Sequence, residues 1–275
     1  MDGFLVEAKR IRGFSRSFRT HFHEEYSIAL VREGRSRAEF PSGPREVSGG
    51  CLVLIPARVP HACNPDTAGA WTYLLLLTDP AWISGISPEA EIRDFLFTED
   101  HRILPAPPDA GAAMEEAARS AGLPDGSGRS EAAEGLKALL LAAADGASRE
   151  EAGPEALQKR TDPRARRIES LLRTRLDGAV TLRELSAEAG VGEREVLRLF
   201  RAAYGISPYD YRTNLRINEA KRLLRSGVGI SDAVQRVGFF DQSHLHRHFV
   251  RRVGLTPAAY AARVGIVQDD HPRIR

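Results

Sequence analysis

The spacing of apolar residues near the C-terminus predicts an amphipathic helix. Leu245, Phe249 and Val253 recur every four positions, which places them on one face of a helix. The remaining faces carry polar and basic side chains. Asp241 before this run and Gly254 after it are typical signals for the start and the end of a helix. The pattern therefore predicts a helix with one buried stripe and a basic surface that faces solvent.

The C-terminal half contains the same pair of helices twice. Residues 230–237 predict a short helix before the one just described, across a glycine turn, and such a pair makes a helix-turn-helix. Residues 182–189 and 193–203 predict an earlier pair, and residues 208–224 predict a long helix that joins the two units. A further amphipathic helix is expected at residues 163–176.

Residues 4–77 are expected to be rich in β-strands. Apolar or alternating segments occur at residues 22–32, 35–40, 51–55 and 70–77, and Gly and Pro residues separate them. Many short strands with such turns between them predict a β-sandwich or a small barrel.

Helices and a linker are expected between these two regions. The sequence predicts helices at residues 88–97, 109–121 and 130–144, followed by a polar connection at residues 146–162. The apolar face of the third helix comprises Leu136, Leu139, Leu140 and Ala143. This face has two interpretations: it covers the open side of the β-domain, or it pairs two subunits. We favour the pairing of subunits.

Composition indicates a globular protein with an uneven distribution of charge. Of the 275 residues, 42% are hydrophobic and 28% are charged, and the formal net charge is +2. Residues 159–275 nevertheless hold 23 Lys and Arg against 13 Asp and Glu, an excess of ten positive charges. Residues 1–158 hold the remaining 16 and 24, an excess of eight negative charges. This asymmetry favours nucleic acid as the partner of the C-terminal half.

The sequence gives no indication of export or of a membrane span. The N-terminus lacks an apolar signal core, and no apolar run approaches the ~18–20 residues that cross a bilayer. The two cysteines, Cys51 and Cys63, do not imply a disulfide framework. A cytoplasmic location without a membrane partner is therefore expected.

The polar face of the last predicted recognition helix offers chemistry suited to DNA. Arg side chains donate to guanine edges and phosphates, and a Gln amide pairs with adenine edges. The alternative is an ordinary amphipathic helix with a solvated basic face. A set of residues with fixed, ungapped spacing supports the DNA-binding interpretation. The set comprises Ala233, Gly238-Phe239, Asp241-Gln242-Ser243-His244-Leu245, Arg247, Phe249, Arg251, Gly254, Thr256-Pro257 and Tyr260. This set resembles the signature of the AraC/XylS family of transcription regulators.

The helical spacing places Leu197 and Arg201 on an outward face, and the resemblance implies that Arg194, Arg198 and the residues of the second unit named below face the DNA. We expect a DNA-binding surface made of Arg194, Leu197, Arg198 and Arg201 in the first unit and Gln242, Ser243, His246 and Arg247 in the second. The first unit departs from the family pattern, because Gly192 and Glu195 stand where the family usually has Ser and an aromatic residue or His. Glu195 near DNA would repel a phosphate or accept from a cytosine amino group.

Two N-terminal segments resemble the cupin barrel that occurs in sensor domains of the same family. The residues concerned are His21 and His23 followed by Gly34, and residues 50–56 followed by His61 and Asn64. In metal-binding cupins, a His pair, a Glu and a later His hold one metal ion. Here Ser27 stands at the position expected for the Glu. We therefore expect the three histidines to line a pocket, without a metal or another cofactor.

The interior of this barrel is expected to shield a small-molecule effector from water. The expected lining residues are His21, His23, Tyr26, Arg37, His61, Trp71 and Tyr73. This mixture of imidazole, guanidinium and aromatic groups suits a ligand with a carboxylate or several hydroxyls.

The resemblance thus implies an α+β multidomain fold. A cupin-like effector-binding barrel would occupy residues 1–97, a helical dimerisation and linker region residues 98–162, and a double helix-turn-helix domain residues 163–265. The implied function is sequence-specific transcription regulation, as an activator and not as an enzyme. The implied partners are double-stranded promoter DNA, a small-molecule effector, RNA polymerase and a second copy of the chain.

Two other functions fit parts of the sequence. One is a metal-dependent cupin enzyme with a DNA-binding tail, against which the missing Glu argues. The other is a constitutive nucleic-acid binder whose barrel only dimerises.

Overall fold

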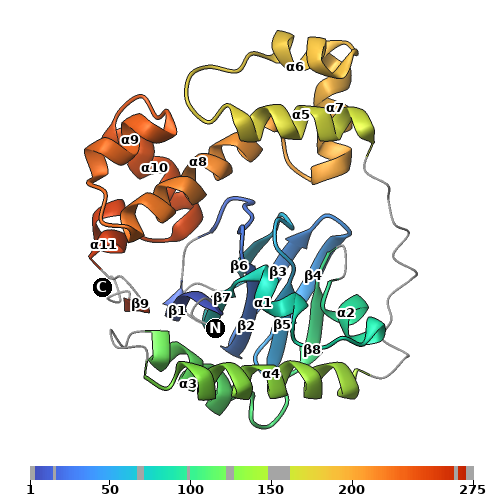
Figure 1. Ribbon diagram of the computed structural model, residues 1–275, viewed down its shortest axis with the longest axis vertical. Coiled ribbons are helices and arrows are strands. Elements are labelled where there is room, and N and C mark those ends of the chain that lie inside the picture. Colours follow the sequence, from blue (N-terminus) through green and yellow to red (C-terminus); the bar gives the residue numbers. More distant parts are fainter. Residues whose placement is uncertain are drawn as a thin grey trace.

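The strands form two sheets in the computed structural model, which describes residues 4–14, 17–66, 71–97, 100–121, 127–147, 162–262 and 266–270 (Figure 1). The strands are β1 (Leu5–Phe14), β2 (Tyr26–Glu33), β3 (Arg35–Phe40), β4 (Gly43–Ser48), β5 (Cys51–Ile55), β6 (Ala62–Pro65), β7 (Trp71–Thr78), β8 (Arg102–Pro105) and β9 (Ile266–Asp270). The larger sheet has the strand order β8-β5-β2-β7-β1-β9, and the smaller sheet has the order β4-β3-β6.

Both faces of the larger sheet are buried, as β2 illustrates. Tyr26, Ile28 and Leu30 belong to an apolar core on one side. Ser27 and Val31 face the other side, where the smaller sheet lies. Successive side chains of a strand point to opposite faces, so this division follows from the pleat. The interior expected for the barrel is the space between the two sheets.

The start of one predicted strand is corrected by the structure. The strand expected at residues 22–32 begins only at Tyr26. Before it, His21 forms a single antiparallel bridge with His61, and Phe22 packs in the C-terminal domain. The strands expected at residues 35–40 and 51–55 are confirmed as β3 and β5.

Helices cover the outer face of the larger sheet (Figure 1). They are α1 (Pro80–Ser84), α2 (Ala90–Leu96), α3 (Ala110–Ala121) and α4 (Arg129–Gly146). Leu136, Leu139, Leu140 and Ala143 of α4 are buried in this core. The apolar face that we favoured for pairing two subunits is therefore covered within the chain. None of the described helices combines the length and the apolar character that a bilayer span requires.

The helices of the C-terminal domain begin where local signals predict them. They are α5 (Pro163–Thr174), α6 (Leu182–Ala189), α7 (Glu193–Tyr204), α8 (Pro208–Arg225), α9 (Ile230–Val237), α10 (Gln242–Val253) and α11 (Pro257–Ala261). Thr181 and Glu184 form a capping box at α6. At α10, the Asp241 carboxylate accepts from the His244 backbone N–H at 2.6 Å. The two helix-turn-helix units, α6–α7 and α9–α10, lie toward opposite ends of α8 (Figure 1).

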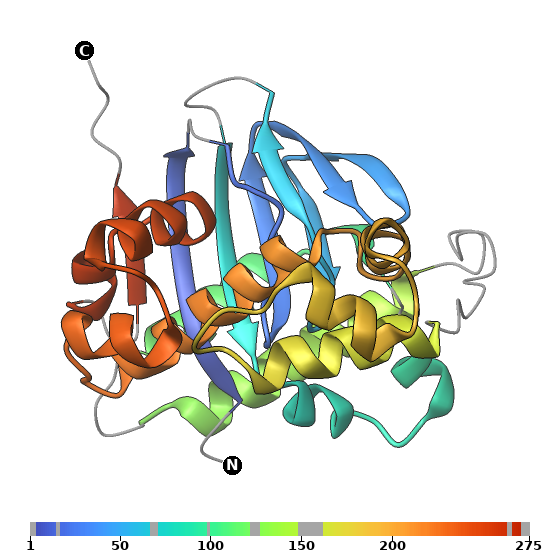
Figure 2. The same ribbon diagram turned by 90° about the horizontal axis from the view of Figure 1, so that it is seen from above.

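After the helical domain, strand β9 returns to the sensor domain. Strand β9 pairs in parallel with β1, at the edge of the larger sheet (Figure 2). A domain boundary at residue 265 therefore leaves this strand out. Figure 2 also shows the second helix-turn-helix unit, in red, beside β1, in blue.

Candidate DNA-binding surface and ligand cavity

The recognition helices α7 and α10 expose every side chain that we expected to contact DNA. The exposed residues are Arg194, Leu197, Arg198 and Arg201 on α7 and Gln242, Ser243, His246 and Arg247 on α10. Val196 and Phe200 on α7, and Leu245 and Phe249 on α10, are buried on the opposite faces. This division follows from the helical period of 3.6 residues.

One arginine of α7 is held in an ion pair within the helix. Arg198 Nη2 lies 2.5 Å from Glu195 Oε1, and Arg198 Nε donates to Glu195 Oε2 at 2.9 Å. The hydrogen bond from Arg198 lowers the pKa of Glu195, so the carboxylate remains charged at neutral pH. The Glu195 carboxylate thus lies on the exposed face of α7 and occupies two donors of Arg198.

Phe240 is an exposed aromatic residue that sequence reasoning missed. Its side chain is 91% exposed, directly before the helix cap at Asp241, whereas neighbouring Phe239 is buried. Two consecutive aromatic residues at a helix entrance cannot both face the core, and this was the available signal. Phe240 extends the exposed surface of the second unit at the N-terminus of α10.

The loop between α5 and α6 connects the two units. Arg216 of α8 donates from Nε to Leu176 O at 2.7 Å and from Nη2 to Gly178 O at 2.8 Å. Gly238, in the turn of the second unit, lies against the same loop. A Cβ atom at Gly238 would be 2.9 Å from Asp177 Cα and 2.9 Å from Leu176 O. The second unit is thus seated directly on a loop that belongs to the first.

A cavity of about 60 Å³ lies between the two sheets. Five of the seven expected lining residues contribute to it: His21, His23, His61, Trp71 and Tyr73. Most of the remaining wall is apolar and comes from Ile11, Phe18, Ala29, Val31, Val47, Val53, Ile55 and Leu75.

Tyr26 and Arg37 do not line this cavity, which corrects the expectation for both. Tyr26 faces the helix-covered side of the sheet, where its hydroxyl donates to Leu96 O at 2.8 Å. Arg37 is exposed on β3 and lies 3.7 Å from Glu39.

The rest of the wall was also not expected from the sequence, and it comprises Lys9 of β1, Ser27 of β2, Cys63 of β6, and Arg252 and Val253 of α10. The end of the second recognition helix is therefore part of the cavity wall. Arg252 Nη2 contacts Asp210 Oδ1 at 3.1 Å. Arg252 Nε and Trp71 Nε1, in contrast, are buried donors without a hydrogen-bond partner among the described residues. Unpaired buried donors are costly, so the cavity favours a ligand that supplies acceptors.

The three histidines of the cavity form one cluster. Their exposed fractions are 8% for His21, 6% for His23 and 5% for His61. One ring nitrogen from each lies within 4.8 Å of the others. Burial lowers the pKa of all three, that of His61 to about 4, so the rings are neutral at neutral pH.

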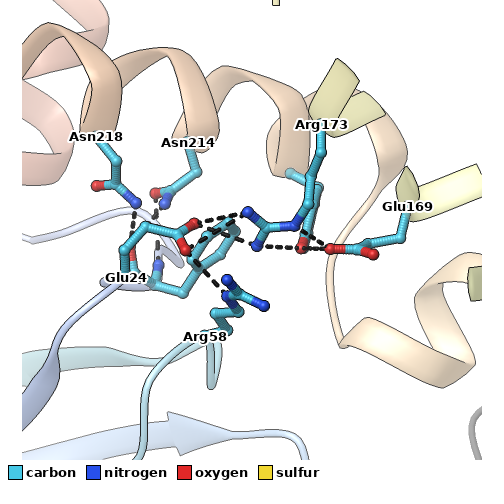
Figure 3. Close-up of polar contacts among 8 residues, drawn as sticks. Glu24, Arg58, Glu169, Arg173, Asn214 and Asn218 are labelled. Carbon is cyan, nitrogen blue, oxygen red and sulfur yellow. Dashed lines mark hydrogen bonds and ion pairs between the residues drawn. The ribbon is translucent and has the colours of Figure 1, made fainter. Parts of the chain in front are cut away.

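The segment that carries two of these histidines also contacts the DNA-binding domain (Figure 3). Phe22 is fully buried in the apolar core of the first unit, and its ring centroid lies 4.7 Å from that of Tyr211. Asn214 Nδ2 of α8 donates to Phe22 O at 2.6 Å, and Asn218 Nδ2 donates to the same oxygen at 3.2 Å. The side chain and the backbone of Phe22 are thus both held by the C-terminal domain.

Glu24 adds an ionic contact at the same place (Figure 3). Its carboxylate accepts from Arg173 of α5 at 3.2 Å and from Arg58 of the sensor domain at 2.9 Å. Arg173 also contacts Glu169 on α5. Phe22 and Glu24 therefore both contact the C-terminal domain.

A buried ionic cluster around Glu7 forms a second interdomain contact. Lys221 Nζ lies 3.0 Å from Glu7 Oε2, Tyr260 donates to that oxygen at 2.7 Å, and Arg225 lies 3.2 Å from it. Lys9 approaches the other oxygen at 3.3 Å. Burial acts to raise the pKa of Glu7, but the charges of Lys221 and Lys9 and the other contacts outweigh burial, and the pKa lies well below its usual value.

Both halves of the chain match family models. Residues 5–156 match the model described as an AraC-like ligand binding domain, and residues 185–263 match the model described as a helix-turn-helix domain.

Relatives and solved structures agree with this division. The chain is 28% identical over 245 residues to the uncharacterized HTH-type transcriptional regulator YbfI of Bacillus subtilis. The aligned region covers 87% of this chain and 86% of YbfI. It is also 40% identical to the HTH-type transcriptional activator RhaR of Yersinia pseudotuberculosis over 72 residues. That aligned region covers 26% of this chain and 25% of RhaR. The crystal structure of ToxT from Vibrio cholerae, bound to an unsaturated fatty acid, has the same fold, with a TM-score of 0.60 and 12% identity over 98% of this chain and 99% of ToxT.

Proposed function

Since the chain belongs to the AraC family and is a DNA-binding transcription regulator with an N-terminal ligand-binding domain, we propose that a small molecule in the cavity controls its two recognition helices. In this proposal, the exposed faces of α7 and α10 enter successive major-groove segments of one promoter site. Base edges would be read mainly by Gln242 and Arg247, because Arg198 is paired with Glu195.

The observation that carries the proposal is the wall that the cavity shares with α10. Typical ligand pockets have volumes of about 300–1,000 Å³, whereas this cavity has about 60 Å³. An organic effector can therefore enter only if the wall moves. Arg252 and Val253 form the part of the wall that belongs to another domain. A ligand that requires their displacement binds the open arrangement more tightly, and this difference in affinity shifts the population.

The lining indicates the chemical class of the effector. Arg252 Nε and Trp71 Nε1 lack acceptors among the described residues, Lys9 lies in the same wall, and the strands contribute apolar side chains. We therefore propose a ligand with an apolar body and an anionic, acceptor-bearing end. The fatty acid bound to ToxT, which shares the fold, has this character.

The remaining parts of the proposal concern partners and location. RhaR is named a transcriptional activator, which supports the same role for this chain, through RNA polymerase at a promoter in the cytoplasm. A homodimer would double the number of recognition helices on the DNA. Its interface would lie outside the apolar face of α4, because that face is covered within the chain.

Selection of bound duplexes from a random DNA pool, with the full chain, tests the DNA-binding part. We expect an enriched site with two contacted segments about one helical turn apart. Arg247→Ala should weaken binding to that site by about 1–3 kcal/mol and relax one base position. Arg222→Ala is the control, because Arg222 is an exposed arginine of α8. If Arg247→Ala keeps the affinity and preference of the unchanged chain, its assignment to the groove is wrong.

A thermal-shift screen of carboxylates with apolar bodies tests the effector part. A true effector should raise the melting temperature and change the affinity for the selected DNA site. Both effects should weaken in Arg252→Met, which keeps the apolar stem but removes the donors. A ligand that acts equally on both proteins would contradict the role of α10 in the site.

A further inference from the structure

The hydrogen bonds of the histidine cluster determine which ring nitrogens carry protons. Nδ1 of His21 lies 2.8 Å from Arg19 O, and Nδ1 of His61 lies 2.9 Å from Val59 O. A carbonyl oxygen only accepts, so both Nδ1 atoms carry the hydrogen. In a neutral imidazole, Nε2 then keeps its lone pair. Such a backbone contact on one nitrogen is the usual way in which a protein orients a metal-binding histidine.

The composition of the cavity restricts the kind of ion that it suits. The described lining contains three neutral imidazoles and no carboxylate. Imidazole ligands suit zinc, cobalt, nickel and copper, whereas magnesium and calcium require oxygen ligands. A volume of about 60 Å³ corresponds to about two water molecules, so the cavity has room for an ion with a water molecule or one ligand atom.

The two cations of the wall are already paired with carboxylates. Lys9 lies 3.3 Å from Glu7, and Arg252 lies 3.1 Å from Asp210. Their charges are therefore largely compensated at the cluster. What remains of their positive potential favours an anionic ligand in any position that three histidines leave open on a metal.

We propose that His21, His23 and His61 form a binding site for a divalent transition-metal ion, and that its occupancy is transmitted to the first helix-turn-helix unit through Phe22. This differs from the expectation drawn from the sequence, which rejected a metal because Ser27 replaces a Glu. The structure supplies a reason to revise it: three buried imidazoles converge, and two of them are oriented by backbone carbonyls.

The transmission follows from the position of Phe22. Zn–N distances of about 2.0–2.1 Å require the ligand nitrogens of a tetrahedral site to lie about 3.3 Å apart. In the structure the corresponding atoms are separated by up to 4.8 Å. An ion would therefore draw His21 and His23 toward His61. Phe22 lies between the two and is bound on its other side by Asn214 and by the core of the first unit. Closure of the site must move or strain this contact.

Metal titration of the full, tag-free chain tests the proposal. Binding of Co²⁺ is followed by visible absorption, and binding of Zn²⁺ by calorimetry, with far-UV circular dichroism as a check of the fold. We expect one ion per chain, and no competition from Mg²⁺ at millimolar concentration. His61→Gln and His23→Gln should each weaken binding at least about 100-fold, because even outer partners of metal ligands contribute about 10–100-fold. His246→Gln, which removes an exposed imidazole, should bind metal as the unchanged chain does.

Hydrogen exchange reports the transmission. Zn²⁺ should change exchange in α7 and in the first half of α8 of the unchanged chain. It should not do so in Phe22→Ala, which is expected to retain the metal stoichiometry. Absence of metal binding, or equal binding by His61→Gln and the unchanged chain, overturns the metal site. Metal binding with unchanged exchange in α7 and α8 overturns the transmission. None of these readouts involves DNA, so the proposed function is tested separately.

Discussion

Gly238 shows how one residue fixes the relation between the two DNA-binding units. It adopts a positive φ of +73° in the turn of the second unit, a region that L side chains rarely occupy. The backbone of residues 176–177 also leaves no room for a Cβ atom there. Two independent requirements, one local and one tertiary, therefore select glycine at this position.

Gly238→Ala should destabilise the chain by about 1–2 kcal/mol through the positive φ, and by a further ~1–3 kcal/mol through the clash with backbone that cannot move cheaply. Gly227→Ala is the matched control, because Gly227 has a φ of +82° and nothing within 4 Å of the added Cβ. Urea unfolding of both variants separates the two contributions. Equal destabilisation would show that the contact with the α5–α6 loop is unimportant.

Glu7 makes stability depend on acid pH. The pKa of Glu7 in the folded chain lies well below its usual value. Its contribution to the free energy of unfolding is therefore fully present above about pH 4.5 and is lost as the pH falls further. Glu7→Gln should cost about 3–5 kcal/mol at pH 7, because Lys221 and Lys9 remain buried without their counter-charge. The difference in urea midpoint between the variant and the unchanged chain should shrink between pH 4.5 and pH 2. A difference that is independent of pH would contradict the ionic role of Glu7.

Two elements each serve two sites. Helix α10 presents Gln242 and Arg247 to solvent along its exposed face, and its last turn closes the cavity with Arg252 and Val253. The segment at residues 21–23 places two imidazoles in the cavity and a phenyl ring in the first unit. Each element therefore links the interior of the sensor domain to one of the two DNA-binding units.

Glu195→Gln should increase DNA affinity about 3–10-fold, because it removes a negative charge from α7 and releases Arg198 for a phosphate. Glu219→Gln is the control on α8, since Glu219 pairs with Arg222 at 2.6 Å in the same i,i+3 geometry. Fluorescence anisotropy with one labelled duplex compares the two variants. An equal gain in both would indicate a general charge effect instead of a role for α7.

At the scale of the whole molecule, the charge asymmetry coincides with the division into domains. The basic C-terminal domain is seated on an acidic sensor half through the Glu24 contact and the Glu7 cluster. In both contacts, Arg or Lys side chains of the helical domain pair with a Glu of the sensor half. The basic and acidic parts of the chain are thus in direct contact. Arg194 and Arg201 of α7 and Arg247 of α10 are exposed and take no part in the Glu24 contact or the Glu7 cluster, whereas Arg198 is paired with Glu195.

Specific binding by the full chain should depend steeply on salt. Phosphate contacts from two basic recognition helices release counterions, and six or more contacts lower affinity by a factor on the order of 10³ between 50 and 200 mM salt. The slope of log affinity against log salt concentration, measured on the selected duplex, gives the number of contacts. A flat dependence would exclude the electrostatic part of the proposed interface.

Local chemistry let the sequence predict most of the helical domain. Caps such as Thr181 with Glu184, and the four-residue spacing of Leu245 and Phe249, act within a few positions of the chain. The eight expected DNA contacts are exposed for the same reason, because a helix with one buried stripe must present its other faces to solvent.

The sequence by itself therefore determined the helices, their exposed faces and the position of three histidines in the cavity wall. Only the tertiary structure decided which other residues surround the cavity. Tyr26 was misplaced because β2 is buried on both faces, so alternation carried no sign of which face lines the cavity. Arg252, Val253 and Phe22 make contacts between the two domains. The periodic spacing of apolar residues within a helix or strand does not predict such contacts. Such contacts depend on how two separately folded surfaces dock, and that is set by long-range packing and not by neighbours along the chain.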